Sequence, residues 1–271
     1  MGRMKQSPTR HRARRRFGQN FLRDESVVHR INTAIGAQAS EHLVEIGPGQ
    51  GALTDALLSS GCTLDVIELD RDLVPGLLAS FGLKPGFTLH RADALDFDFA
   101  ALAEPGCKLR VVGNLPYNIS TPLIFGLLAQ ASRIHDMHFM LQREVVQRLA
   151  AESGGKTWGR LGIMAQYHCR VEHLFDVPPQ AFYPSPSVHS AVVRLVPWER
   201  SPWPDCDTTR LGAVVRTAFG QRRKTLRNNL TALIDSSQLE VLGIDPGARP
   251  ETLSLTQFID IANAIHVQHA I

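Results

Sequence analysis

Short apolar runs and amphipathic stretches alternate along the first half of the chain. The apolar runs predict buried strands over residues 43–46, 62–69, 87–91, 108–112 and 138–141. Between them, apolar residues recur with the helical period, which predicts helices over residues 25–35, 52–60, 72–81, 121–131 and 144–151. Because strands alternate with helices, we expect a parallel sheet with right-handed crossovers, which is the doubly wound α/β class.

The start signals of two helices are explicit in the sequence. Asp24 stands where a side chain would cap the helix over residues 25–35, and Thr121 precedes a proline at the first helical position. Farther along, the pattern changes: residues 162–171 and 187–196 predict two strands with a long connection, a pair that can complete the sheet in antiparallel fashion.

A cluster of prolines after residue 196 marks a linker, and residues 208–271 have the helical period. We therefore predict three parts. An N-terminal arm covers residues 1–23, an α/β domain covers 24–198, and a small all-helical domain covers 199–271.

Charge is distributed unevenly, although the net charge is only +3. Residues 1–23 hold eight Lys or Arg and no acid, so that the remainder carries −5. Residues 208–234 also lack acids, and their basic side chains are Arg210, Arg216, Arg222, Arg223, Lys224 and Arg227. One such cluster is most often a solvated surface, but two of them, the second with amides interleaved, favour contact with the phosphates of a nucleic acid.

Composition limits the remaining classes of protein. The four cysteines are scattered without the paired spacing of a zinc site, so we expect free thiols in a reducing cytoplasm and no metal. No apolar stretch has the length of a membrane span, and the basic N-terminus does not lead into the apolar core of a signal peptide. The chain is expected to act in the cytoplasm, without a membrane and as a monomer.

A glycine-rich turn, "EIGPGQGA", follows the first predicted strand and opens a helix. Glycines at Gly47 and Gly49 let the backbone approach a nucleotide-like ligand. The spacing satisfies both the dinucleotide fingerprint and the methyltransferase one, so the turn alone leaves the ligand open. Glu68 ends the second strand, where a carboxylate accepts hydrogen bonds from ribose hydroxyls in either case. Asp93 follows the third strand at the same edge and could reach the exocyclic amine of a bound adenine.

The stretch "NLPY" follows the fourth strand at this edge. An adenine amine is a poor nucleophile until its hydrogens are held out of the ring plane, which requires two acceptors. The side-chain oxygen of Asn114 and the carbonyl of Leu115 could supply them, because Pro116 keeps Leu115 extended. Tyr117 offers a flat face on which the base can stack. The segment therefore predicts a clamp for an aromatic amine.

The chain resembles the S-adenosylmethionine-dependent ribosomal RNA adenine dimethyltransferases. The matching stretches are "FGQNFL", "EIGPGQGALT", "IELD", "DAL", "GNLPYNIS", "QREVVQRL" and "FYPSPSVHSAV", in family order over nearly the whole chain. Within the family, the pattern is more similar to the bacterial branch that acts on small-subunit (16S) RNA than to the macrolide-resistance branch that acts on large-subunit RNA.

The resemblance implies a Rossmann-like class I methyltransferase sheet over residues 24–198, with S-adenosyl-L-methionine as cofactor. It also implies a substrate, small-subunit ribosomal RNA in a pre-ribosomal particle, with two adjacent adenosines of a hairpin loop near the 3′ end each dimethylated at N6. Phe182 would help Tyr117 hold the flipped adenine. The implied cofactor-binding residues are Asn20, Leu22, Gly47, Gly49, Glu68, Asp93, Ala94 and Asn114. From the charge pattern, the expected RNA-binding residues are Arg14, Arg15, Arg16, Arg222, Arg223, Lys224 and Arg227.

Three other functions remain open at this point. A nicotinamide-dependent dehydrogenase would fit the glycine turn and Glu68 but leaves "NLPY" and both basic clusters unexplained. A DNA adenine methyltransferase would fit the clamp. A non-catalytic ribosome assembly factor would use the same basic surfaces.

Overall fold

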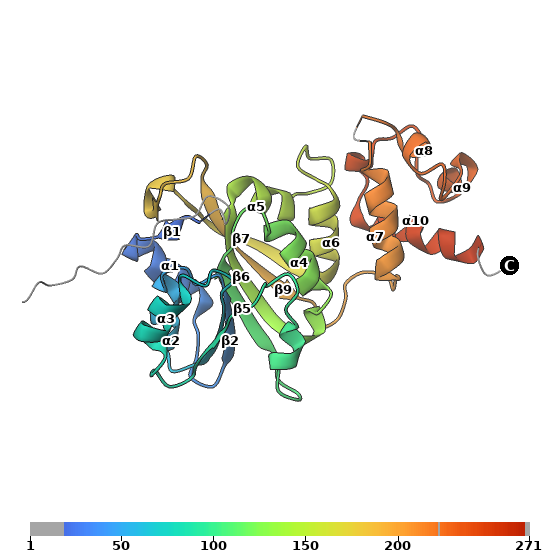
Figure 1. The fold of residues 1–271 in the computed structure, drawn as a ribbon. Coiled ribbons are helices and arrows are strands. Elements are labelled where there is room, and N and C mark those ends of the chain that lie inside the picture. Colours follow the sequence, from blue (N-terminus) through green and yellow to red (C-terminus); the bar gives the residue numbers. More distant parts are fainter. Residues whose placement is uncertain (1–18, 222, 269–271) are drawn as a thin grey trace, which may run out of the picture. The chain divides into compact units, whose positions relative to one another are not determined.

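A seven-stranded sheet forms the centre of the fold in the computed structural model, which describes residues 19–221 and 223–268. The strand order is β4-β3-β2-β5-β6-β9-β7 (Figure 1). The bounds are His42–Ile46 for β2, Thr63–Ile67 for β3, Phe87–His90 for β4, Leu109–Asn114 for β5, Ile134–Gln142 for β6, Cys169–Val177 for β7 and Ser190–Pro197 for β9. Strands β2 to β6 pair in parallel, which confirms the predicted α/β class.

Helices cover both faces of the parallel part of the sheet. Figure 1 shows three of them on one face, α1 (Glu25–Ile35), α2 (Ala52–Leu58) and α3 (Val74–Phe81), and α4 (Ser120–Leu128) on the other. The strand order turns back at β2, because β3 and β4 extend to one side and β5 and β6 to the other. In open α/β sheets, ligands bind outside the carboxyl ends of the strands at such a point.

Helix α1 has the boundaries that its sequence predicts. The Asp24 carboxylate accepts hydrogen bonds from the backbone N–H groups of Ser26 and Val27, and the helix ends where Gly36 adopts a left-handed conformation with φ +58°. Its apolar stripe, which includes Ile31 and Ile35, is buried. The carbonyl of Ile35, the last residue of the helix, accepts a 2.7 Å hydrogen bond from the Arg110 side chain of β5, which fixes the end of the helix to the sheet.

Two predictions about local structure were wrong. The stretch 162–171 is not a strand but the helix α6 (Arg160–His168) followed by β7. Its residues 161–165 are all buried, and a continuous apolar run does not distinguish a buried strand from a buried helix. Helix α4 begins at Ser120, so Thr121 lies inside its first turn and does not cap it.

A second, two-stranded sheet was not predicted. Strand β1 (Phe21–Leu22) pairs antiparallel with β8 (Phe182–Tyr183), and Leu22 lies opposite Phe182. Figure 1 shows the yellow segment that includes β8 beside the blue β1, although more than 150 residues separate them in the chain. This pairing fixes the last residues of the predicted N-terminal arm beside β8.

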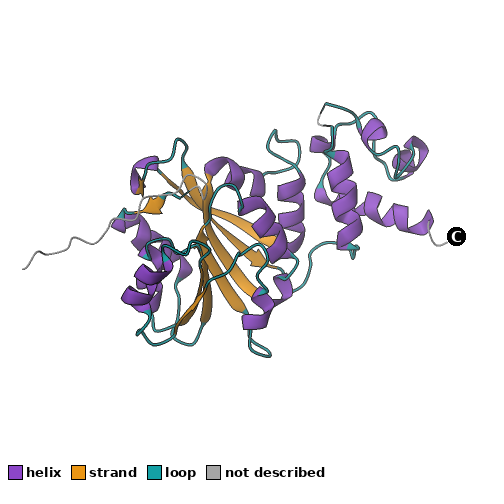
Figure 2. Ribbon diagram, in the orientation of Figure 1, coloured by secondary structure: helices purple, strands orange, loops and turns teal. Residues whose placement is uncertain are grey.

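The chain divides into two compact units. The first runs to Gln142 and includes Asp176–Val192; the second holds Arg143–Phe175 and continues from Val193. The second unit is largely helical (Figure 2). Besides α6 its helices are α5 (Arg143–Leu149), α7 (Thr208–Ala218), α8 (Leu226–Asn229), α9 (Ser236–Val241) and α10 (Leu255–Gln268). The domain boundaries at residues 24 and 198 stay predictions.

Within the second unit, the C-terminal helices pack against the α5–α6 region. The indole N–H of Trp158 donates a hydrogen bond of 2.8 Å to the carbonyl of Leu253, and the ring is buried. Phe219 and Phe258 pack at 5.8 Å between ring centroids. Residues 208–268 are mainly helical, as their periodicity predicts.

Candidate cofactor and substrate site

A cavity of about 330 Å³ lies at the carboxyl edge of the first unit. Its walls come from the loops after β2, β3, β4 and β5 and from residues 19–22. All eight residues predicted to bind the cofactor line it, and so do three residues of the predicted clamp, Leu115, Pro116 and Tyr117. The cavity lies within the range of small-molecule sites, at its lower end.

The floor of the cavity is the glycine turn between β2 and α2. Gly47, Gly49 and Gly51 all have positive φ, at +66°, +60° and +85°, a conformation that other residues rarely adopt. A side chain at Gly49 would come within 3.0 Å of the Phe21 ring, and one at Gly51 within 2.4 Å of Phe81. Glycine is therefore required both for the conformation of the turn and for the close packing of the Phe21 and Phe81 rings against it.

One wall of the cavity is acidic. Glu45, Glu68, Asp70 and Asp93 all line it, and all except Asp93 are buried. Burial, opposed by a hydrogen bond from the Thr54 hydroxyl at 2.6 Å, raises the pKa of Glu45 to about 7. Burial also raises the pKa of Glu68, whose carboxylate accepts a 2.7 Å hydrogen bond from the backbone N–H of Asp70. Buried carboxyl groups at a cavity favour a cationic ligand, because a positive charge there would stabilise their ionised form.

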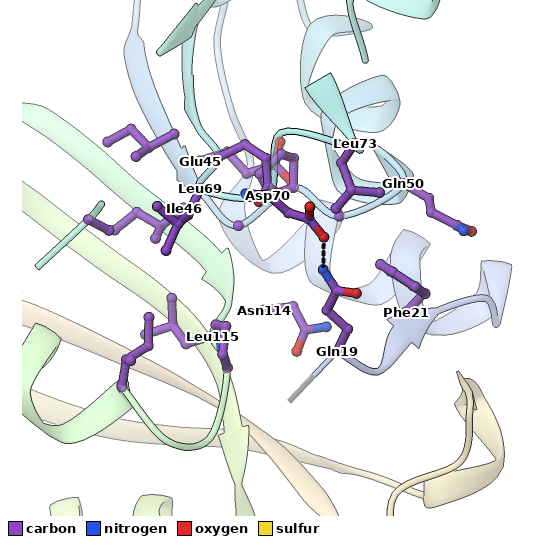
Figure 3. A pocket seen from close by; sticks show the side chains of 18 of the residues that line it. Gln19, Phe21, Glu45, Ile46, Gln50, Leu69, Asp70, Leu73, Asn114 and Leu115 are labelled. Atoms are coloured by element: carbon purple, nitrogen blue, oxygen red, sulfur yellow. Dashed lines mark hydrogen bonds between the residues drawn. The ribbon is translucent and has the colours of Figure 1, made fainter. Parts of the chain in front are cut away.

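The segment 19–22 closes one side of the cavity through two hydrogen bonds, of which Figure 3 marks the first. The side-chain amide of Gln19 donates to the Asp70 carboxylate at 2.9 Å, shown by the dashed line. The Asn114 side-chain N–H donates to the backbone carbonyl of Asn20 at 3.1 Å. The second bond fixes the orientation of the Asn114 amide, so that its oxygen is directed away from Asn20 and is available as an acceptor.

The predicted clamp is positioned by its neighbours. Asn114 ends β5, and the Leu115 N–H donates to the carbonyl of Met140 on β6 at 3.2 Å. The Tyr117 hydroxyl is 3.0 Å from the hydroxyl of Ser190, the first residue of β9. Burial raises the pKa of the Tyr117 phenol, so the ring stays neutral and can stack on a base.

Phe182 differs from the other predicted catalytic residues. It is 5% exposed, paired in β1–β8, and does not line the cavity, whereas a side chain that holds the flipped adenine would have to be accessible. The antiparallel partner β1 buries it, and no sequence pattern signals that pairing. Its role in holding the adenine stays a prediction.

The predicted RNA-binding residues are only partly described. Arg14, Arg15, Arg16 and Arg222 lie outside the described residues. Arg223, Lys224 and Arg227 are exposed, at the start of α8. The Asn229 side chain donates to the carbonyls of Ala218 and Gln221, which fixes the loop that carries two of these cations.

Several site residues were missed by the sequence analysis. Glu45 carried a detectable signal, because a charged residue inside an otherwise apolar strand, directly before the glycine turn, must be buried. Gln19, Asp70 and Ser190 lie within the stretches that match the family, but no pattern in the sequence indicated their contacts. Gln19 and Asp70 are 51 residues apart, and Ser190 is 73 residues from Tyr117, so only the folded chain brings these pairs together.

S-Adenosyl-L-methionine suits this cavity. The glycine turn gives close backbone approach, the apolar walls accept an adenine ring, and the acidic wall matches the positive sulfonium and ammonium groups. A nicotinamide dinucleotide carries two phosphates, and the acidic wall would repel them.

Comparisons with known proteins agree with this geometry. Residues 10–266 match the model of the ribosomal RNA adenine dimethylase family. "Ribosomal RNA small subunit methyltransferase A" of Pseudomonas aeruginosa is 62% identical over 255 residues, which are 94% of this chain and 95% of that protein. The protein of the same name from Chromohalobacter salexigens is 57% identical over 266 residues, 97% of this chain and 94% of that protein. These matches leave the dehydrogenase, the DNA methyltransferase and the non-catalytic factor without support.

Two solved structures share the fold. A dimethyladenosine transferase from Plasmodium falciparum has a TM-score of 0.78 at 23% identity and covers 92% of this chain and 98% of its own. The 23S rRNA methyltransferase ErmE has a TM-score of 0.69 at 22% identity, with 91% and 100% covered. Among the described helices, none is both long and apolar enough to cross a membrane.

The family model covers most of the chain, and the relatives named above are more than half identical to it. The chain therefore belongs to the ribosomal RNA adenine dimethylase family, whose members are S-adenosyl-L-methionine-dependent methyltransferases of ribosomal RNA.

Proposed function

We propose that this chain dimethylates N6 of two adjacent adenosines in a hairpin loop near the 3′ end of small-subunit ribosomal RNA. It would do so during subunit assembly, in the cytoplasm and as a monomer. The name shared by relatives 62% and 57% identical supports the small subunit as the target. The observation that carries the chemistry is the position of Asn114, on the wall of the cavity with its N–H groups turned toward Asn20.

The Asn114 amide oxygen accepts one hydrogen of the adenine amine. The other hydrogen is accepted by the Leu115 carbonyl. Both bonds hold the amine hydrogens on one side, so that the nitrogen lone pair leaves conjugation with the ring and becomes nucleophilic. Because Asn20 already fixes the amide, the acceptor is preorganised and costs no reorganisation during the reaction.

The target base must leave the RNA stack to reach the clamp, at a cost of a few kcal/mol. The Tyr117 ring receives the extruded base, and Ser190 holds that ring in place. Phe182 contributes to the same contact if its packing opens when RNA binds.

S-Adenosyl-L-methionine, when bound, supplies an electrophilic methyl group on a sulfonium and is left as a neutral thioether. The amine nitrogen forms the new bond to the methyl carbon and then loses a proton to water, since an alkylated cationic amine is acidic. The monomethylated amine keeps one hydrogen and its lone pair. One of the two acceptors, Asn114 or Leu115, can therefore hold the remaining hydrogen while the same nitrogen is methylated again, which gives the dimethyl product.

The preferred substrate in this proposal is the structured particle. The two cationic regions, residues 1–23 and 208–234, offer more basic surface than one hairpin loop needs. The test compares methyl incorporation into small subunits from unmodified cells with incorporation into the matching free hairpin, at physiological salt. We expect faster modification of the subunit and a dimethylated product. Equal rates would contradict the particle requirement, and a product stalled at monomethyladenosine would contradict repeated action at one site.

A further inference from the structure

An exposed tyrosine and an arginine form a stacked pair on the two-stranded sheet. The guanidinium carbon of Arg23 lies 4.7 Å from the centroid of the Tyr183 ring. Tyr183 is 60% exposed, whereas Phe182 beside it is 5% exposed, because successive side chains of a strand point to opposite faces. Among the described residues, no carboxylate forms an ion pair with Arg23. An exposed aromatic ring with an unneutralised cation on it suits a nucleotide.

The backbone that carries this pair is fixed on both strands. Phe21 lies opposite Tyr183 in β1–β8. The N–H groups of Arg23 and Asp24 both donate to the carbonyl of Ala181, at 2.8 and 3.2 Å. After β8, the Ser185 hydroxyl donates to the carbonyl of Pro179 at 2.8 Å. The ring therefore keeps its place without a ligand, which lowers the entropy that binding must cost.

The same elements also form the substrate site. Phe21, the neighbour of Tyr183 across the pair, lines the cofactor cavity. The loop that leaves β8 after Tyr183 contains two prolines and ends at Ser190, whose hydroxyl contacts that of Tyr117. The exposed ring is thus linked to the predicted adenine-stacking ring by one short, stiff segment.

We propose that Tyr183 and Arg23 form a second base platform, which holds a single-stranded nucleotide that flanks the target adenosine. The flanking base stacks on the Tyr183 ring, and the Arg23 guanidinium contacts its phosphate. Stacking on a ring does not read the base sequence, so the platform accepts any base. The proposal rests on the proposed function, since it assumes an RNA loop at the cavity. It explains how one unstacked adenosine enters the site while the nucleotide beside the adenosine pair is kept ordered.

Fluorescence tests the stacking directly. Small subunits are reconstituted with RNA in which 2-aminopurine replaces, one at a time, the nucleotides on either side of the adenosine pair. Stacking quenches this base, so the wild type and Tyr183→Phe should quench one of the two positions on binding. Tyr183→Ala and Tyr183→Thr should not; the threonine keeps the strand preference of the position. Quenching that persists in both truncated variants would overturn the platform.

Kinetics provide the second readout. Removal of one stacked base should lower kcat/KM for the RNA by roughly 5- to 100-fold, mainly through KM. The affinity for S-adenosyl-L-methionine should not change, which also shows that the β1–β8 pair is intact. Arg23→Gln should reduce the slope of log affinity against log salt by just under one. The control is Leu83→Ala, fully exposed in the loop between α3 and β4, which should have no effect.

The possible failures are distinguishable. If wild-type protein does not methylate small-subunit RNA, the proposed function is wrong. If it does, and Tyr183→Ala keeps the wild-type kcat/KM and quenching, only the platform is wrong and the Arg23–Tyr183 contact is a surface pair.

Discussion

The two edges of the parallel sheet differ in whether their buried charged side chains have a partner of opposite charge. At the amino edge, Arg110 of β5 donates two hydrogen bonds to the Asp136 carboxylate, at 2.8 and 3.1 Å, and one to Glu41 at 2.8 Å. A fourth goes to the carbonyl of Ile35, the last residue of α1. Each of these charged side chains thus has an opposite charge beside it. At the carboxyl edge, Glu45 and Glu68 are buried beside a cavity, and no described cation pairs with either of them.

This difference separates stability from function. Paired charges at the amino edge fix α1 and two strands, whereas the acidic cavity wall is destabilising until a cationic ligand is present. The pKa values of Glu45 and Glu68 are raised because burial disfavours their ionised carboxylates, and a cationic ligand would offset this unfavourable free energy. Mutations at the amino edge should therefore lower stability with little effect on chemistry, whereas mutations at the carboxyl edge should impair chemistry without lowering stability.

The largest effect on stability should come from Arg110→Met. It removes two charge-assisted hydrogen bonds from the Asp136 carboxylate, which is 0% exposed. Breaking a buried pair by removing one partner costs about 3–5 kcal/mol of unfolding free energy, measured by urea unfolding. The double variant Arg110→Met with Asp136→Leu should recover part of this stability. If Arg110→Met were as stable as wild type, the charge pairs at the amino edge would not stabilise the fold, and the contrast between the two edges would be wrong.

At the carboxyl edge, Asn114→Ala should abolish methylation. Removing one preorganised acceptor raises the barrier by about 3 kcal/mol or more, a slowing of over 100-fold. A single-turnover assay with saturating RNA and cofactor measures it. Calorimetry should find cofactor affinity largely intact, and unfolding free energy should change little. Near-normal turnover would refute the clamp.

Stability should also depend on pH through Glu45. The folded pKa of about 7 lies above the ordinary value of 4.5, so the unfolded chain releases this proton first. Unfolding free energy should therefore fall as pH rises from about 4.5 to 7, by up to about 3 kcal/mol from this group, and stay level above.

Urea unfolding at pH 5 and pH 7.5 checks this sign. Glu45→Gln, which can still accept the Thr54 hydrogen bond, should remove the decline. In Thr54→Val, the fall in unfolding free energy should extend to higher pH, because the Thr54 hydroxyl stabilises the Glu45 carboxylate in the folded chain. The same decline in wild type and Glu45→Gln would assign it to other groups.

The smallest effect should come from the exposed cations near α8. Replacing Arg223, Lys224 and Arg227 by Ala should weaken RNA binding and reduce the slope of log affinity against log salt by somewhat under one unit for each phosphate that is no longer bound. Arg133→Ala is the matched control, because Arg133 is also exposed but precedes β6 at the amino edge. An unchanged slope in the triple variant would mean that these cations face solvent and do not contact RNA phosphates.

The sequence predicted the residues that line the cavity better than the contacts that hold those residues in place. Strand ends, the glycine turn and "NLPY" are local patterns, so they placed eight site residues at one edge of the sheet, and the family resemblance added Asn20, Leu22 and Ala94. The β1–β8 pair and the Tyr117–Ser190 contact join distant segments with no periodic signal, and therefore the burial of Phe182 was not foreseen. The continuous apolar run of α6 was mistaken for a strand because a buried helix and a buried strand share a composition.

Mass spectrometry of small-subunit RNA tests the central claim most directly. RNA from cells that lack this protein is compared with RNA from cells that express wild-type chain or Asn114→Ala. We expect two adjacent N6,N6-dimethyladenosines near the 3′ end with the wild type, and unmodified adenosines at both positions in the deletion strain and with Asn114→Ala. Dimethyladenosines that persist in the deletion strain, or that Asn114→Ala restores in full, would contradict the account.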